Sequence, residues 1–190
     1  IDLNHSIFDL AYEMYGIKKY LNKRIVRCGK NTLEPYNENP ENLILQQDDI
    51  LFIDFGPIFE QWEADFGRTY VIGNDPDKIK LKIDIESAWY DCKRYFETKK
   101  EITGAELYQY ATDLALNYNW EFGGEIAGHI IGNYPHEKLE KEDKTNYVHP
   151  NNHENMYNND KDNKTRNWIL EIHFVDRKKK IGGFFEQLLA

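Results

Sequence analysis

The sequence has no long apolar run, and this absence bounds the kind of protein it encodes. A membrane-spanning helix needs roughly 18 or more consecutive apolar residues, and nothing of that length occurs among the 190 residues. Hydrophobic residues at 41% and charged residues at 30% are ordinary for a globular protein. The length is that of one domain. We therefore expect residues 1–190 to form a single soluble domain without a membrane partner.

Cysteine and positive charge are also scarce. The two cysteines, Cys28 and Cys92, lie far apart, which excludes a disulfide scaffold and a thiolate metal site. Asp and Glu outnumber Lys and Arg by 33 to 24, giving a net charge of -9. This balance disfavours nucleic acid as a partner, because phosphates require a basic surface. With no signal-peptide pattern, these features predict a cytoplasmic location.

Acidic residues are abundant, and four of them fall into two predicted β-hairpins. In Asp48–Gly73, a turn near Phe59 and Glu60 places Asp54 directly across from Asp65. In Asn167–Leu189, a turn near Lys178 and Lys179 places Glu171 across from Glu186 in the same way.

Facing carboxylates on one sheet surface repel each other, at a cost of up to about 1 kcal/mol for each pair. Two such pairs suggest that a cation lies between them, and hard oxygen ligands with room for imidazole suit divalent Mn, Fe, Co or Zn. On the pairing alone, an equal alternative stays open: the acids simply face water.

Further motifs lie between and within the hairpins. Residues 128–137 read GHIIGNYPHE, the first hairpin contains Asp54-Phe55-Gly56, and its second arm reads Asp65-Phe66-Gly67-Arg68-Thr69. In these motifs, and in the order Asp, Asp, His, Glu, Glu, the chain resembles the pita-bread family of metallopeptidases. That family includes methionine aminopeptidases, Xaa-Pro aminopeptidases and Xaa-Pro dipeptidases (prolidases), and the short final hairpin is most similar to the Xaa-Pro peptidases.

The resemblance implies a fold and a site. The fold would be α+β, a curved and mainly antiparallel sheet of two pseudo-symmetric halves with helices on its outer face. Two divalent metal ions (Mn, Co, Zn or Fe) would bind in the concavity and share a bridging water that becomes hydroxide near neutral pH. The implied metal ligands are Asp54, Asp65, His129, Glu171 and Glu186.

The resemblance also implies catalytic roles and a substrate. Glu171 would move the proton of the bridging water, and His136 would bind the substrate and stabilise the developing oxyanion. The substrate would be a short peptide cleaved at its N-terminus, with Xaa-Pro sequences the first to test; a homodimer is left open. Two alternatives remain: a binding protein without catalysis, and a non-peptidase hydrolase or lyase on the same fold.

Two positions depart from the family pattern on the substrate side. Tyr36 stands after Pro35 where the family usually has histidine, and His173 lies in an Ile-His-Phe stretch that replaces a common Pro-Gly pair. We assign Tyr36 and His173 to substrate binding, while an equal alternative for Tyr36 stays open, namely that its ring only packs beside the loop. A phenol there stays neutral near pH 7, so Tyr36 is expected to orient substrate and not to relay a proton.

Periodicity predicts the remaining elements. Helices are expected over His5–Tyr15, with Ile7, Leu10, Ala11 and Met14 on its apolar face, over 77–99, and after the capping box that starts at Thr103. Asp75 is the expected cap of the second helix, whose apolar stripe contains Ile79, Ile83, Ala88, Trp89 and Tyr95. A short strand is expected over Lys23–Cys28. The segment 138–166 is rich in charged and amide residues and is predicted to be a mobile polar insertion whose histidines, His149 and His153, are solvated.

Overall fold

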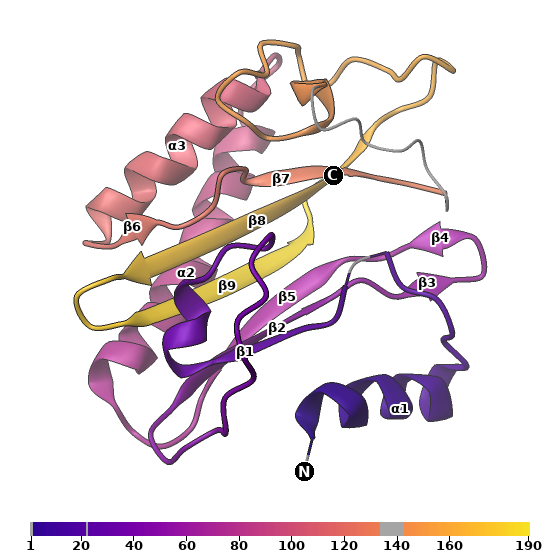
Figure 1. Cartoon of the computed structure of the whole chain (residues 1–190). Helices are drawn as coiled ribbons and strands as arrows, with labels where there is room; N and C mark the ends of the chain where they lie inside the picture. Colours follow the sequence, from indigo (N-terminus) through magenta and orange to yellow (C-terminus); the bar gives the residue numbers. More distant parts are fainter. Residues whose placement is uncertain (1, 22, 134–142) are drawn as a thin grey trace.

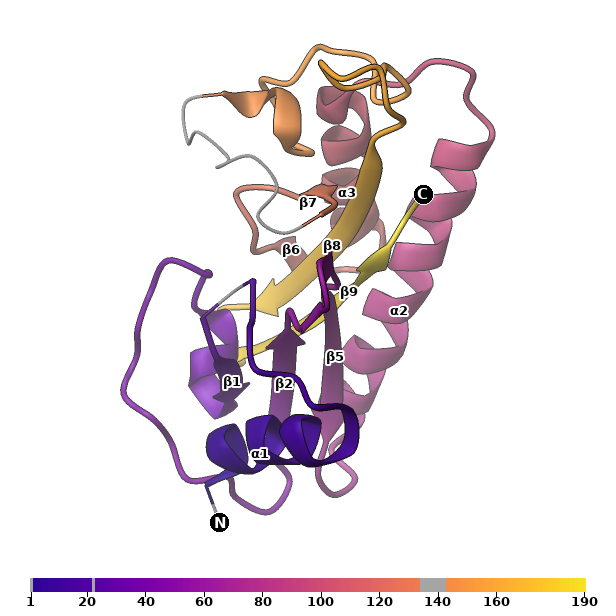
Figure 2. The ribbon, with the colours of Figure 1, turned by 90° about the vertical axis from the view of Figure 1, so that its right-hand side faces the viewer.

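One antiparallel sheet forms the centre of the computed structural model, which describes residues 2–21, 23–133 and 143–190. The strand order is β1-β2-β5-β9-β8-β6, and β7 also pairs with β8. These strands are β1 (Ile25–Cys28), β2 (Ile50–Phe55), β5 (Phe66–Val71), β6 (Glu121–Phe122), β7 (Gly128–Ile131), β8 (Asn167–Asp176) and β9 (Ile181–Leu188). A separate two-stranded ribbon joins β3 (Ile58–Phe59) to β4 (Trp62–Glu63). Figures 1 and 2 show the sheet curving, with the two long helices on one face.

The two long helices cover the sheet as the sequence predicts. Asp75 caps α2 (Pro76–Glu97), and Thr103 and Glu106 form the capping box of α3 (Gly104–Asn117). The indole nitrogen of Trp89 donates to the carbonyl of Leu170 in β8 at 2.8 Å, which ties α2 to the sheet. No helix in the described part of the chain is both long and apolar enough to cross a membrane.

The predicted apolar faces were partly wrong. In α2, Ala88 and Trp89 are buried as predicted, but Ile79 and Ile83 are exposed, and Leu81 and Ile85 are buried in their place. The buried positions recur every three or four residues, so the helix follows its periodicity, and the prediction was wrong only in the face it chose for the first turns.

The first helix packs in another place and by another residue. α1 (Leu3–Tyr15) is capped by Asp2 and ends at Gly16, which has a φ of 69°. It packs through Phe8, whose ring lies edge-on to Tyr20 at 4.3 Å and to Phe55 at 5.4 Å. Of the predicted apolar face, Ala11 is buried as predicted, but Leu10 and Met14 are wrong, because both remain more than half exposed.

The register of the first hairpin differs from the prediction. Asp54 pairs with Gly67, not with Asp65. The turn lies at Glu60 and Gln61, because the β3–β4 ribbon extends the hairpin, and this moves each pairing by two residues. A shift of two keeps a side chain on the same sheet face. In the second hairpin, Glu171 pairs with Glu186 as predicted.

The motif residues after Asp65 form the seam between β5 and β9. Gly67 pairs with Glu186 across this seam, and a Cβ on Gly67 would lie 2.3 Å from the Phe184 ring. The Thr69 hydroxyl donates to the Phe184 carbonyl at 2.8 Å and accepts from the Phe184 amide at 2.7 Å. The motif therefore holds the two parts of the sheet together.

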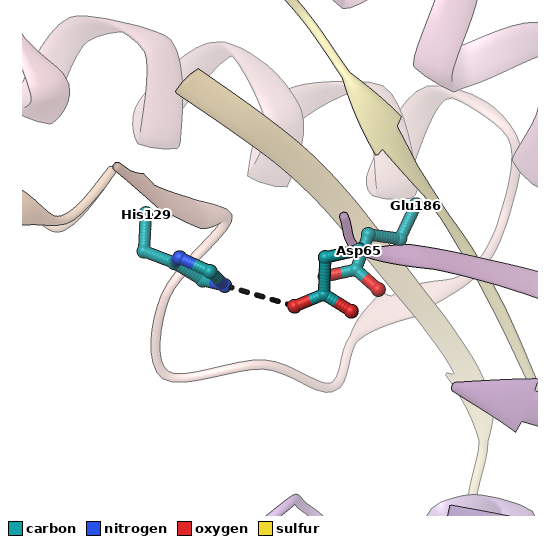
Figure 3. Close-up of side chains that lie close together, drawn as sticks. All are labelled: Asp65, His129 and Glu186. Carbon is teal, nitrogen blue, oxygen red and sulfur yellow. Dashed lines mark ion pairs between the residues drawn. The ribbon is translucent and has the colours of Figure 1, made fainter. Parts of the chain in front are cut away.

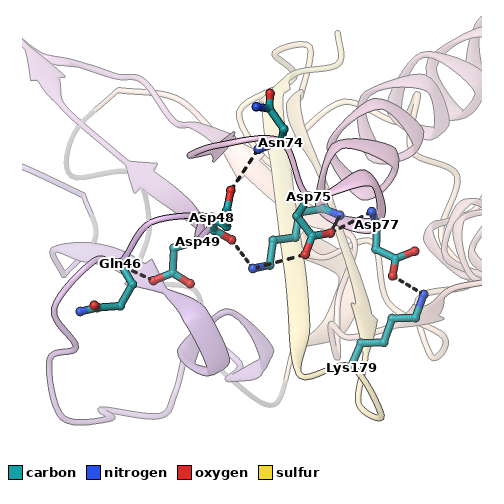
Figure 4. Close-up of polar contacts among 8 residues, drawn as sticks. Gln46, Asp48, Asp49, Asn74, Asp75, Asp77 and Lys179 are labelled. Atoms are coloured by element: carbon teal, nitrogen blue, oxygen red, sulfur yellow. Dashed lines mark hydrogen bonds and ion pairs between the residues drawn. The ribbon is translucent and has the colours of Figure 1, made fainter.

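An acidic cluster at the far end of this seam is accounted for by structural contacts (Figure 4). The Asp48 side chain accepts from the Asn74 amide at 3.2 Å, and the Asp75 side chain accepts from the Asp77 amide at 2.9 Å. Lys179, in the turn between β8 and β9, reaches Asp77 at 2.8 Å. These contacts fasten the start of α2 to both hairpins.

The polar insertion contains anchors that its composition did not reveal. Residues 143–166 hold only one short helix, η2 (Lys144–Asn146), as regular structure. Val148 and Met156 are nevertheless buried in the main core, and the Met156 carbonyl accepts from the Trp168 indole at 2.9 Å. The insertion is therefore anchored to the core at Val148 and Met156, which its composition did not predict, while its mobility stays a prediction. Residues 138–142 lie outside the described residues.

Candidate metal centre

The five predicted metal ligands come from both sides of the β5–β9 seam. Asp54 lies in β2 and Asp65 directly before β5, while His129 lies in β7, Glu171 in β8 and Glu186 in β9. Along β8, Leu170 and Ile172 belong to the core under the helices. Because side chains alternate along a strand, Glu171 points to the opposite face. There it lines a cavity of about 410 Å³ together with Asp54, His129 and Glu186.

Asp65, His129 and Glu186 form the tightest part of this site (Figure 3). Each contributes one ligand atom, and all three atoms lie within 4.8 Å of one another. Nε2 of His129 lies 3.5 Å from Oδ2 of Asp65. Among the described residues, the buried Oε2 of Glu186 has no hydrogen-bond partner. An oxygen of this kind, next to a carboxylate and an imidazole, fits a bound cation.

The backbone orients His129 toward this cluster. Its Nδ1 lies 2.8 Å from the Ile130 carbonyl, which accepts a hydrogen bond from it and leaves Nε2 directed at Asp65. Such a bond at one ring nitrogen prepares the other to bind a metal. The preceding residue must be glycine: Gly128 has a φ of 134°, and a Cβ would lie 2.0 Å from the Ile169 carbonyl oxygen.

Burial and mutual repulsion perturb the acids strongly. The pKa of Glu171 is raised to about 7, mainly by burial of the carboxyl and to a smaller extent by the charge of Asp65. Burial first, and then the charges of Asp65 and Asp54, raise the pKa of Glu186 well above its usual range. Burial alone would lower the pKa of His129, but Asp65, Glu171 and the Ile130 carbonyl together raise it to about 9. The negative charge gathered here favours a cation, whether protons or metal ions.

The predicted substrate-side residues have different surroundings. Tyr36 lines the cavity and is 47% exposed. His173 also lines the cavity but is buried, and its Nε2 donates to the Thr32 carbonyl at 2.8 Å. Burial lowers the pKa of His173 to about 4, so the ring is neutral and links β8 to the helix η1 (Gly29–Leu33). Its contact with substrate stays a prediction. His136 lies outside the described residues.

Other cavity residues were not singled out from the sequence. Arg27 in β1 is 6% exposed and lines the cavity beside Asp54, and Lys144 and Tyr147 line it from the insertion. The sequence does contain a sign that Arg27 has a specific role. It is an arginine inside a short β-branched strand, where a buried charge is unfavourable unless other groups bind it.

A buried set of carboxylates with one imidazole, on the open face of an antiparallel sheet, offers the kind of donor groups that divalent metal ions prefer. Residues 1–164 match metallopeptidase family M24. The chain therefore belongs to this family of metallopeptidases. Glu171 and Glu186 lie beyond the matched residues, so their place in the site rests on the strand register and the cavity.

Similar proteins agree on the fold. A Xaa-Pro dipeptidase of Pyrococcus horikoshii is 27% identical over 129 residues, covering 66% of this chain and 35% of that protein. A prolidase from Thermococcus sibiricus superposes with a TM-score of 0.74 at 18% identity, over 97% of this chain and 46% of that one. A methionine aminopeptidase from Thermotoga maritima gives 0.72 at 12% identity, over 98% and 79%. These likenesses establish the pita-bread fold, while the chain spans about a third of the two curated relatives it matches.

Proposed function

We propose that this domain is a two-metal peptidase that removes residues from the N-terminus of short peptides. The observation that supports this most is the meeting of five ligand-type side chains in and around one cavity: Asp54, Asp65, His129, Glu171 and Glu186. Family M24 contains metallopeptidases. The number of ions and the order of preference among Mn, Co, Zn and Fe belong to the proposal.

The residues present fit such a centre. Carboxylate oxygens and imidazole are the donors that these metals prefer, and five donors from separate strands can hold two ions. When bound, divalent ions lower the pKa of a water molecule and polarise a carbonyl group. Glu171 lines the cavity beside Glu186, where it can accept a proton and pass it to the leaving nitrogen. By its motif position, His136 would donate a hydrogen bond to the developing oxyanion.

We further propose Xaa-Pro peptides as the preferred substrates. The support is the name of relatives such as the Xaa-Pro dipeptidase of Pyrococcus horikoshii, together with the size and lining of the cavity. Its volume of about 410 Å³ suits a small ligand, and Ile25, Pro35 and Phe184 supply apolar walls. Tyr36 and His173 would then border the substrate.

Metal content tests the first part of the proposal. Protein stripped with chelator and dialysed against Mn²⁺ or Co²⁺ is expected to hold about two ions per chain by elemental analysis. Glu101→Gln, which changes an exposed acid outside the site, is the matched control and should bind the same amount. A clear value of zero in correctly folded protein would refute the metal centre.

Hydrolysis tests the second part. Metal-loaded protein is incubated with Xaa-Pro dipeptides, other dipeptides and longer peptides, with and without chelator. Glu171→Gln should lower kcat by about a hundredfold or more, as expected for a group acting in the transition state. Metal-loaded protein that cleaves none of the peptides would favour the binding or non-peptidase alternatives.

A further inference from the structure

The turn that carries Tyr36 is held over the cavity by its own hydrogen bonds and by two cations. The Glu38 amide donates to the Pro35 carbonyl at 3.1 Å, which places Tyr36 in a tight turn. Lys23 Nζ lies 4.8 Å from the centre of the Tyr36 ring. Tyr36 lines the same cavity as Glu171, so the position of this turn decides where its phenol stands.

Arg27 is the main fastening of this turn. Its guanidinium donates to the main-chain carbonyls of Glu34 and Pro35, the latter at 2.8 Å, and to that of Glu38 at 2.9 Å. Arg27 is only 6% exposed, and an arginine buried to this degree is costly unless its donors are satisfied. The single planar guanidinium group of Arg27 thus makes hydrogen bonds to both ends of the turn.

Lys23 supports the turn from the same side. Ile25 and Arg27 lie in β1 and both line the cavity, and Lys23 stands two residues before this strand. Lys23 Nζ donates to the Glu38 carbonyl at 3.0 Å and to Oδ1 of Asn39 at 3.0 Å. Its contacts overlap with those of Arg27 only at Glu38, so the two cations can be tested separately.

We propose that Arg27 is a positioning residue for the reaction: it holds the Glu34–Glu38 turn so that Tyr36 meets the bound substrate at the metal centre. This inference rests on the proposed function and extends it to a residue outside the metal ligands. Arg27 acts through Tyr36 and does not itself contact the reacting atoms. A lysine cannot replace it, because one ammonium group lacks the fork that bridges three carbonyls.

The first test measures the turn without any reaction. Amide hydrogen exchange of Glu38, whose N–H donates to the Pro35 carbonyl, is compared between the unaltered protein and Arg27→Lys. Exchange is expected to become at least about tenfold faster, because charged hydrogen bonds are lost. The control is Arg24→Lys, since Arg24 stacks on Phe8 at 4.4 Å, away from the turn. Unchanged exchange in Arg27→Lys would overturn the proposal.

The second test is a double-mutant cycle on kcat/KM with an Xaa-Pro dipeptide. Arg27→Lys should lower kcat/KM by about tenfold with metal content unchanged, since small misplacements of a contacting group are costly. In a Tyr36→Phe background the same change should have much less effect, because Arg27 acts through Tyr36. Fully additive effects would overturn the proposal. If Arg27→Lys does not fold, Arg27→Gln takes its place in both tests, because it also removes the guanidinium while keeping a polar side chain. If the unaltered protein cleaves no peptide, the proposed function fails, while the exchange result still decides the role of Arg27 in the turn.

Discussion

Glu186 shows how one residue joins the fold to the metal centre. Its backbone pairs with Gly67 of β5 across the seam and with Glu171 of the neighbouring strand β8. The Arg68 side chain donates a hydrogen bond to the Glu186 carbonyl at 2.6 Å. Its side chain is buried beside Asp65 and Glu171, where charge repels charge. The backbone thus holds a carboxylate in a place where a carboxylate is unfavourable without a cation.

Replacing this carboxylate should therefore separate stability from metal binding. In metal-free protein at pH 8, Glu186→Gln should leave the Tm equal or raise it by a few degrees, because the raised pKa of the buried Glu186 carboxyl lowers stability at this pH and a neutral amide has no such effect. The rise in Tm on adding Mn²⁺ should largely disappear, because a ligand is lost. Calorimetry with and without Mn²⁺ measures both, and Glu101→Gln should behave as the unaltered protein. A full Mn²⁺ response in Glu186→Gln would contradict its role as ligand.

At the scale of elements, the β5–β9 seam depends on side chains as well as backbone. The Thr69 hydroxyl makes two hydrogen bonds to Phe184 and is buried. Thr69→Val keeps the shape but leaves the Phe184 amide and carbonyl without this partner, so we expect a loss of about 1–3 kcal/mol in the free energy of unfolding. Urea denaturation measures it. Thr69→Ser keeps the hydroxyl and should recover most of the loss; a Thr69→Val protein that is more stable than Thr69→Ser would show that the methyl group, not the hydrogen bonds, matters.

The contact between α2 and the end of α3 should respond to pH. The Tyr118 hydroxyl donates to Oδ2 of Asp91 at 2.9 Å, and burial first, then this bond, raise the pKa of Tyr118 from 10 to about 12. The folded state favours the neutral phenol, so its contribution is complete below pH 10 and is lost as the pH rises through about 12.

Tyr118→Phe removes this dependence. Between pH 10 and 12 the free energy of unfolding should fall less steeply in the variant than in the unaltered protein, as measured by urea titrations at several pH values. Tyr90→Phe, on the same helix as Asp91, controls for the loss of one phenol. Identical slopes for Tyr118→Phe and the unaltered protein would rule out the contact as a source of alkaline instability.

Local pattern was enough for some elements and not for others. The caps at Asp75 and Thr103 and the pairing of Glu171 with Glu186 follow from short-range chemistry, and the structure confirms them. The predicted pairing partner of Asp54 was wrong because the β3–β4 ribbon lengthens the first hairpin, and strand periodicity does not reveal this ribbon.

Contacts between segments that are distant in the sequence could not be predicted from local sequence patterns. The exposed face of α1 and the burial of Met156 depend on which segment of the chain packs against them. The same holds for Arg27, whose role depends on carbonyl groups in a turn that returns to β1. Residue types in order can therefore indicate a ligand set, while the groups that position it emerge only in three dimensions.

At the scale of the whole molecule, the ligands connect β2 and the start of β5 with β7, β8 and β9, so metal binding should stabilise the domain globally. Cys92 reports on global unfolding: it is fully buried in the core, and burial raises the pKa of its thiol. The thiolate is the reactive form, so labelling of Cys92 requires the core to open.

A Cys28→Ser protein leaves Cys92 as the single thiol. With free Mn²⁺ at roughly 100 times its Kd, a site that binds only the folded state adds about 2.7 kcal/mol, so labelling should slow by about a hundredfold. Adding Glu186→Gln should remove most of this protection, while Glu101→Gln should not. Labelling that stays equally fast with metal bound would mean that the core opens without breaking the site, and that the two parts of the sheet unfold independently of the ions between them.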